Sequence, residues 1–246
     1  MNTEVEKEIK KEFEVERLIF FSDAVFAIII TIMILDVKLP EALVHPTEEE
    51  SKKAFIHIIP KLAAYVASFF VIGSFWMRHL KVFSFLKDYN KQLLALNLLF
   101  LFSLSLFPFA LSFAFSSSYI MQYTWGIYTY IGIVYMAFFT QGILIGYLVR
   151  NREALCERPD EMENILRWKI RRLSLYAVPV LFLLMICAGY FHISMYYVFG
   201  SMIAYGILVG RLKKKLYPDH KNDDVTLISF FRKVKVEKHR AKRVQQ

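Results

Sequence analysis

The sequence has few cysteines and lacks the motifs of common metal sites and catalytic sites. It contains only two cysteines, Cys156 in a polar stretch and Cys187 in an apolar stretch, so no disulfide framework is expected. It has neither an HExxH nor a GxSxG motif, and its histidines do not have the spacing of a metal site. The sequence therefore predicts that the protein is not an enzyme and has no cofactor.

Charge is also missing from long stretches of the chain. Hydrophobic residues make up 56% of the 246 residues and the mean hydropathy is +0.38, whereas soluble domains are about 45 to 50% apolar. A membrane span needs about 20 mostly apolar residues, and six runs approach or exceed that length. They cover residues 18–35, 56–77, 93–115, 120–149, 173–191 and 193–209. The predicted fold class is an all-α integral membrane protein with six transmembrane helices.

The sequence in and around the first three runs also predicts local structure. Residues 1–16 alternate Glu and Lys and predict a solvated helix that leads into the first span. Because the chain opens with these charges and the first apolar run has full length, no cleavable signal peptide is expected. Residues 41–53 are expected to form a polar loop. Pro60 is expected in the first turn of span two, where proline is tolerated, and Pro108 is expected to kink span three.

Lysines and arginines are distributed unevenly among the segments that join the spans. The segments before span one, between spans two and three, between spans four and five, and after span six carry 4, 4, 7 and 12 of them. Cytoplasmic segments are enriched in Lys and Arg. The pattern predicts a multi-pass protein of the cell membrane with both termini cytoplasmic. The chain is predicted to consist of an N-terminal segment (1–16), a membrane domain (17–210) and a basic tail (211–246).

The basic tail suggests a membrane partner. The net charge of +9 and the pI of about 9.4 would also suit a nucleic-acid-binding protein, but the topology accounts for where the charges lie. Clusters of Lys and Arg next to a membrane span attract anionic lipid headgroups. We therefore expect membrane lipids as partners, with anionic lipid at the tail, and no nucleic acid.

One acidic side chain, Asp23, interrupts the first apolar run. A carboxylate inside a span costs roughly 2.5 to 3.5 kcal/mol on insertion scales and normally has a polar partner. With the amino terminus inside, Asp23 lies at a depth similar to that of polar residues near the inner ends of spans two and three. The predicted network around it consists of Arg17, Ser22, Asp23, Trp76, His79 and Asn97.

This network has two candidate roles. A fully satisfied buried network fixes the geometry of the helices that contribute to it. Intramembrane Asp and His also relay protons, so a proton-coupled secondary transporter that uses Asp23 and His79 is the alternative. Such transporters often contain an inverted repeat or a pair of broken spans, and neither is evident in the sequence.

The first span also carries a regular apolar stripe. Ala24, Ile28, Thr31, Ile32 and Leu35 recur at the three-and-four spacing of one helix face. Thr31 contributes the single hydroxyl on that face. Spacing alone leaves two interpretations open, which are packing against a neighbouring helix and the lining of a pore.

The polar residues of the first three spans form an ordered set of motifs. They are Arg17, Phe21, Ser22 and Asp23 in R-x-x-x-F-S-D, Trp76 and His79 in W-x-x-H, and Asn97 ahead of Pro108. In order and spacing this set resembles the signature of the transmembrane protein 175 family of potassium channels, which occurs in prokaryotes and in endosomes and lysosomes. The resemblance covers the first three spans by motifs and the last three only by length and topology.

The resemblance implies an architecture and a pore. It implies a single-repeat, prokaryotic form that assembles with other copies of the same chain as a homotetramer, with the first span lining a central pore. Ile28 would form the narrowest hydrophobic ring, Thr31 a layer of hydroxyls, and Ile32 and Leu35 further pore-facing positions. The expected function is a cation channel with modest selectivity for K⁺ over Na⁺, in which the permeant K⁺ is the only metal ion. The glycine-rich TVGYG filter of ordinary potassium channels is absent from the sequence.

Overall fold

The computed structural model describes residues 3–37, 47–115, 120–159, isolated positions between 173 and 190, and residues 195–216. Throughout these ranges the regular structure is helical, apart from one antiparallel bridge between Leu86 and Cys156. Four helical stretches in the described part of the chain are long and apolar enough to cross a membrane. They are Ile9–Leu35, Glu48–Phe83, Lys91–Ala114 and Gly126–Arg150. The prediction of an all-helical membrane fold is confirmed at this level.

The structure does not establish the last two predicted spans. Much of residues 173–191 lies outside the described residues. The final predicted span falls within α9 (Met195–Leu216), whose apolar stretch Ile203–Leu212 is shorter than a full span. The count of six spans therefore stays a prediction.

Helix α1 (Thr3–Ile32) is one unbroken rod of 30 residues, and a short 3₁₀ helix, η1 (Met33–Asp36), follows it. The charged N-terminal segment is helical, as predicted, and it continues into the apolar run without a break. At about 1.5 Å per residue the rod is about 45 Å long. It contains neither proline nor glycine, so nothing in its sequence favours a hinge.

Helix α2 (Glu48–Phe83) begins earlier than the hydrophobic pattern predicts. A capping box starts it, in which the Thr47 side chain accepts from the Glu50 amide and the Glu50 carboxylate accepts from the Thr47 amide at 2.9 Å. The expected polar loop over residues 41–53 is therefore wrong for residues 48–53, because a capping box starts a helix without apolar residues. The expectation for Pro60 is wrong for the same reason, since the earlier start places it inside the helix.

The third apolar run is divided between α3 (Lys91–Ser105) and α4 (Phe107–Phe115). Asn90 caps the start of α3 by accepting from the Leu93 amide at 2.9 Å. Pro108 has no amide hydrogen, so the Leu104 carbonyl loses its helical donor four residues on. Instead it accepts from the amide of Leu106, the residue at the break. The helix is thus interrupted two residues before the proline at which a kink is predicted.

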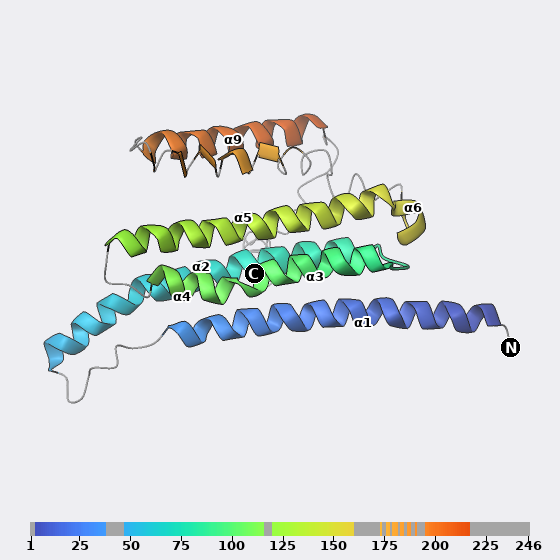
Figure 1. The fold of residues 1–246 in the computed structure, drawn as a ribbon, viewed down its shortest axis with the longest axis horizontal. Helices are drawn as coiled ribbons and strands as arrows, with labels where there is room; N and C mark the ends of the chain where they lie inside the picture. The colour runs from blue at the N-terminus through green and yellow to red at the C-terminus, as the bar shows by residue number, and fades with distance from the viewer. Residues whose placement is uncertain are drawn as a thin grey trace, which may run out of the picture.

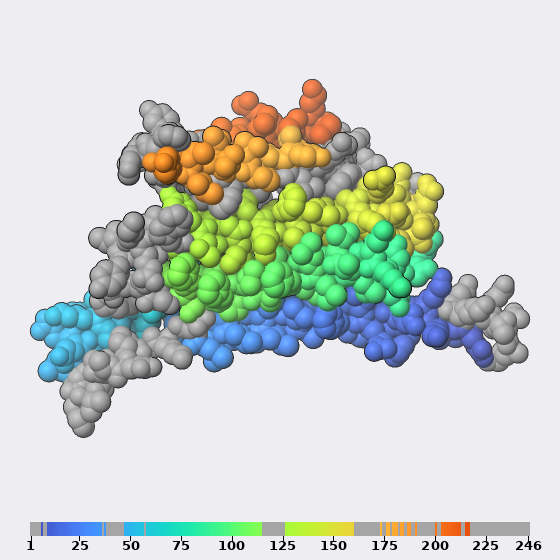
Figure 2. Space-filling model, viewed as in Figure 1, coloured from blue at the N-terminus to red at the C-terminus, as the bar shows by residue number. Residues whose placement is uncertain are grey.

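The helices are arranged as long rods lying side by side (Figure 1). Helices α3 and α4 pack along α5 (Ile120–Arg150), and α1 packs against α2 and α3. Near the start of α5, Gly126 lies so close to α4 that a Cβ there would be 2.5 Å from the Ala114 Cα. The four-residue α6 (Arg152–Leu155) follows α5. Figure 2 shows α1, in blue, along one edge of the molecule with its outer side uncovered.

Candidate functional site

Helix α1 has one buried face, which packs against the rest of the chain. Its buried positions follow one another at intervals of three or four residues, which is the repeat of a single helix face. They are Val15, Leu18, Ser22, Phe26 and Ile29, and Met33 of η1 continues the pattern. This face therefore fixes how α1 is rotated about its own axis.

The four predicted pore residues lie away from that buried face. Ile28, Ile32 and Leu35 are 55%, 45% and 64% exposed, and Thr31 is exposed between them. The Thr31 hydroxyl donates to the backbone carbonyls of Ala27 at 2.9 Å and Ile28 at 3.0 Å. Its donor is thus used within the helix, while oxygen lone pairs remain available to an outside partner. Together these residues form an exposed apolar stripe that carries one hydroxyl.

Behind the stripe, a chain of buried hydrogen bonds joins α1, α2 and α3. Asn97 Nδ2 donates to Ser22 Oγ at 2.9 Å, and Ser22 Oγ donates to the Leu18 carbonyl at 2.9 Å. Asn97 Oδ1 lies 2.9 Å from His79 Nε2. Because the Asn97 amide nitrogen is the donor to Ser22, its oxygen is the acceptor for His79, which therefore carries a proton on Nε2. The hydrogen bonds therefore run in one direction, from His79 to Asn97, from Asn97 to Ser22 and from Ser22 to the Leu18 carbonyl of α1.

Aromatic rings surround the imidazole of His79, which is only 1% exposed. Phe83 stacks on it at 3.9 Å between centroids, Phe100 lies nearly parallel at 5.8 Å, and Phe26 of α1 meets it edge-on at 5.6 Å. Within the described part of the chain, His79 Nδ1 has no hydrogen-bond partner. The rings and the single bond to Asn97 hold the imidazole in one orientation.

The remaining predicted network residues are separate from this chain of bonds. Trp76 Nε1 donates to Asp23 Oδ1 at 2.8 Å, which gives the carboxylate a partner on α2. Arg17 is exposed and makes no hydrogen bond with Asp23 among the described residues, and Phe21 is also exposed. The structure therefore brings the predicted residues together as two groups, Ser22 with Asn97 and His79, and Asp23 with Trp76.

Sequence reasoning missed a second set of contacts, near the start of α1. Lys11 Nζ lies 2.7 Å from Asp88 Oδ2, and Tyr89 Oη donates to Glu14 Oε2 at 2.9 Å. The hydrogen bond from Lys11 lowers the pKa of Asp88, and the hydrogen bond to Glu14 raises the pKa of Tyr89. These residues are 75 and 77 positions apart, so no local pattern reports the pairing.

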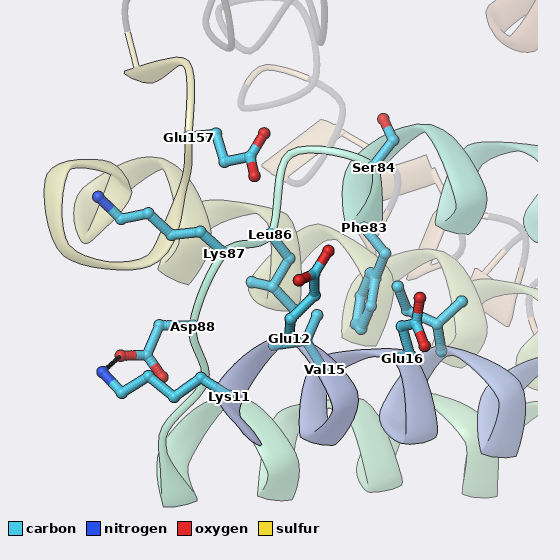
Figure 3. A pocket seen from close by; sticks show the side chains of 11 residues that line it. Lys11, Glu12, Val15, Glu16, Phe83, Ser84, Leu86, Lys87, Asp88 and Glu157 are labelled. Atoms are coloured by element: carbon cyan, nitrogen blue, oxygen red, sulfur yellow. Dashed lines mark hydrogen bonds and ion pairs between the residues drawn. The ribbon is translucent and has the colours of Figure 1, made fainter. Parts of the chain in front are cut away.

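A cavity of about 610 Å³ lies beside these contacts. Figure 3 shows Glu12 of α1 and Glu157, just after α6, on opposite sides of it, with the Lys11–Asp88 ion pair at one end. Apolar side chains from α1, from the end of α2 and from the segment after α2 also line it. They are Val15, Ile19, Phe83 and Leu86. In the ranges that the structure describes, no group of three or more His, Cys, Asp or Glu side chains is arranged to hold a metal ion.

Comparison with known proteins relates the first part of the chain to channels. Residues 17–108 match the family model described as "TMEM175: Endosomal/lysosomal potassium channel TMEM175". A potassium channel of Chryseobacterium sp. (strain P1-3) is 43% identical over 94 residues, covering 38% of this chain and 45% of that protein. A potassium channel of Streptomyces collinus is 41% identical over 92 residues, covering 36% of this chain and 41% of that protein. The matched part thus spans less than half the length of these curated relatives.

Two more distant proteins complete the comparison. The endosomal/lysosomal proton channel TMEM175 of Gallus gallus is 28% identical over 96 residues, which is 39% of this chain and 19% of that protein. The crystal structure of a lysosomal potassium-selective channel TMEM175 homolog from Chamaesiphon minutus has a TM-score of 0.60 at 23% identity, and the match covers 80% of this chain and 98% of that chain. At this identity the structural likeness shows a shared fold. All these relatives are named as channels rather than enzymes, in agreement with the sequence prediction.

Proposed function

We propose that this chain, whose residues 17–108 belong to the TMEM175 potassium-channel family, forms a cation-conducting pore lined by α1. The observation that carries the proposal is the exposed stripe of Ile28, Thr31, Ile32 and Leu35, which lies away from the helix face that packs against α2 and α3. An apolar stripe with one hydroxyl suits a narrow passage better than a lipid surface, because acyl chains cannot interact with the lone pairs of the Thr31 oxygen.

The stripe needs further copies of the chain to enclose a passage. In a single chain the stripe is exposed, and α1 lies along an edge of the molecule with its outer side uncovered (Figure 2). Several copies arranged around an axis would turn these stripes toward one another. We therefore propose a homotetramer in the cell membrane, with six spans in each subunit and both termini cytoplasmic. The distribution of Lys and Arg supports this orientation.

Within such a pore, Ile28 would form the constriction. A ring of isoleucine side chains excludes water when it is narrow, and hydrophobic constrictions gate channels by dewetting. When the ring widens, an ion has to give up part of its hydration shell, which is harder for Na⁺ than for K⁺. The free lone pairs of Thr31, one turn further along, would replace some of the lost water. Because the site has few dipoles, we propose modest selectivity for K⁺ over Na⁺, with K⁺ as the only bound metal ion.

The two polar groups behind the stripe would act as positioning elements. Ser22 is held by Asn97, and Asp23 is held by Trp76. These bonds attach neighbouring residues of α1 to two different helices, so together they resist rotation of α1 about its axis. Such rotation would move Ile28 away from the pore.

Lipids are the other partners that we propose. Helix α2 exposes a row of large apolar side chains, which suits contact with acyl chains. They are Phe55, Ile59, Leu62, Val66 and Phe69. The basic tail, residues 211–246, would attract anionic headgroups rather than nucleic acid, and no cofactor is needed.

Proton movement is the second candidate function, because several relatives are named as proton channels. Proton-coupled transport through Asp23 and His79 would require a path between them. In this structure each side chain has its own partner, Trp76 for Asp23 and Asn97 for His79. The hydrogen bonds of the described residues include none directly between these two side chains. We place K⁺ conduction first because the relatives with the higher identity are named potassium channels.

Reversal potentials test the proposal. Purified protein in liposomes would be placed under separate gradients of K⁺, Na⁺ and H⁺. We expect the potential to follow the K⁺ gradient most closely and the Na⁺ gradient more weakly. A potential that follows only the H⁺ gradient would favour the second candidate, and the absence of any current would contradict both.

A further inference from the structure

The N-terminal part of α1 is attached to the segment between α2 and α3 by two polar contacts. Lys11 Nζ donates to Asp88 Oδ2 at 2.7 Å, and Tyr89 Oη donates to Glu14 Oε2 at 2.9 Å. Lys11 and Glu14 are three positions apart and so lie on one side of the helix. The adjacent residues Asp88 and Tyr89 therefore bind two residues on one side of α1.

The segment that provides these contacts is itself held in place. We call residues 84–90 together with residues 152–157 the platform. Within it, the Lys87 amide donates to the Leu155 carbonyl and the Glu157 amide donates to the Phe85 carbonyl, each at 2.9 Å. Lys87 Nζ also donates to the Glu153 carbonyl at 3.1 Å. The platform thus joins the end of α2 to the end of α5 and forms a fixed support.

The space between α1 and the platform is hollow. The cavity of about 610 Å³ separates Glu12 and Glu16 of α1 from Leu86 and Glu157 of the platform (Figure 3). Side chains that line a cavity lack close-packed partners across it. Val15, Phe83 and Leu86 on its wall are buried in the apolar core, so the two polar contacts add to an attachment that apolar packing already provides on one side of the cavity.

Helix α1 connects this attachment to the proposed constriction. Ile28 lies 17 residues beyond Lys11 in the same helix, a distance of about 26 Å along the axis. Because the helix has no proline or glycine between these points, tilt or rotation at one end is transmitted to the other. A contact at the start of α1 can therefore bias the position of Ile28.

We propose that the platform, through Asp88 and Tyr89, positions α1 and thereby sets how often the pore opens. This inference rests on the proposed function. In the conformation described here both contacts are formed and α1 is restrained. Widening the ring requires α1 to move, so losing either contact lowers the free energy needed to open the pore.

Single-channel recording in planar bilayers tests this role with Asp88→Asn and Tyr89→Phe. An exposed polar contact changes an equilibrium constant by at most about fivefold. We therefore expect each variant to raise the ratio of open to closed time by about two- to fivefold. Unit conductance and the K⁺ to Na⁺ permeability ratio should not change, because the pore wall is untouched.

A charge exchange and a matched control make the test specific. The double variant Lys11→Asp with Asp88→Lys restores an ion pair of reversed polarity and should return the open ratio toward that of the wild type. Lys53 and Glu49 form a second exposed ion pair, 3.4 Å apart and within α2. Glu49→Gln removes that pair without touching α1 and should leave the open ratio unchanged.

The possible failures can be told apart. If the wild type conducts and the open ratio is unchanged or lower in both variants, or is not rescued by the exchange, the positioning role is wrong and the channel proposal stands. If the wild type carries no current, the channel proposal itself fails. Should Asp88→Asn not assemble, Tyr89→Phe, which keeps the ring and loses only the hydroxyl, decides the matter.

Discussion

The side-chain amide of Asn97 donates to Ser22 Oγ across 2.9 Å, and this bond ties α3 to the buried face of α1. The same Asn97 accepts from His79 of α2 through its other amide atom. One side chain therefore joins three helices. Because all three groups are buried, removing any of them leaves a polar atom without a partner in a place that water does not reach.

The first prediction compares two serines. Ser22 and Ser105 both donate to a carbonyl of their own helix, but only Ser22 is buried and accepts from Asn97. Ser22→Ala should lower the free energy of unfolding by about 1 to 3 kcal/mol, because the Asn97 amide loses its acceptor. Ser105→Ala should change it by less than about 0.5 kcal/mol. Denaturation of the purified protein in detergent measures both, and equal effects would contradict the proposed importance of the bond.

The second prediction concerns the constriction. Ile28→Asn places a polar amide on the exposed stripe and should admit water to the ring, because a polar lining favours wetting. Cation current at a fixed potential should rise by about tenfold, which corresponds to about 1.4 kcal/mol of barrier. Leu98→Asn is the control, since Leu98 is equally exposed but lies on α3. An unchanged current in Ile28→Asn, or the same increase in both variants, would argue against Ile28 as the gate.

The third prediction concerns Thr31. Thr31→Val keeps the shape of the side chain and removes the oxygen that we expect to meet the ion. The ratio of K⁺ to Na⁺ permeability should change by about two- to fivefold, since one such contact is worth up to about 1 kcal/mol. Thr31→Ser keeps the hydroxyl and should preserve the ratio. If Val and Ser behave alike in bi-ionic reversal potentials, the hydroxyl does not face the ion.

The fourth prediction is a pH dependence at the platform. The hydrogen bond from Lys11 holds the pKa of Asp88 below its ordinary value of 3.8. A carboxyl with a lowered pKa in the folded state stabilises the fold above its unfolded pKa, and this contribution disappears as the pH falls through the folded value. Wild type should therefore melt at a higher temperature than Asp88→Asn from about pH 5 to 8.

Below the ordinary pKa of Asp88 this difference in melting temperature should shrink toward zero. Thermal scans in detergent at several pH values measure it. Glu49→Gln, which removes an exposed ion pair of α2, should match the wild type throughout. If the difference in melting temperature between the wild type and Asp88→Asn grows as the pH falls, the predicted direction of the pH dependence is wrong.

The sequence predicted the parts of this arrangement that follow from local rules. Helical spacing placed Ile28, Thr31, Ile32 and Leu35 on one face, and the structure exposes them together. The missing amide hydrogen of Pro108 predicted the break between α3 and α4. A carboxylate in an apolar span predicted that Asp23 needs a partner, and Trp76 provides one.

Other features were not predicted from the sequence, and some of them depend on contacts between distant parts of the chain. Lys11 and Asp88 are 77 residues apart, and alternating charge at the start of α1 gives the same pattern whether or not such a pairing exists. The start of α2 was misplaced because hydropathy ignores the capping box of Thr47 and Glu50. Arg17 was expected beside Asp23 from sequence proximity, whereas the rotation of α1 leaves it exposed.

The fifth prediction uses two glycines to test the packing of α5. A Cβ on Gly126 would lie 2.5 Å from the Ala114 Cα and 3.0 Å from the Phe113 carbonyl oxygen, whereas one on Gly73 would meet nothing within 4 Å. Backbone atoms cannot turn aside as a flexible side chain can, so Gly126→Ala must push α4 and α5 apart. Overpacking of this kind typically costs about 1 to 3 kcal/mol.

Gly73→Ala is the matched control for this prediction. It should leave stability unchanged or raise it by up to about 1 kcal/mol, because alanine favours a helix over glycine where no clash occurs. Melting temperatures of the two variants in detergent should therefore move in opposite directions from that of the wild type. A Gly126→Ala variant as stable as Gly73→Ala would mean that α4 and α5 do not approach as closely as the structure places them.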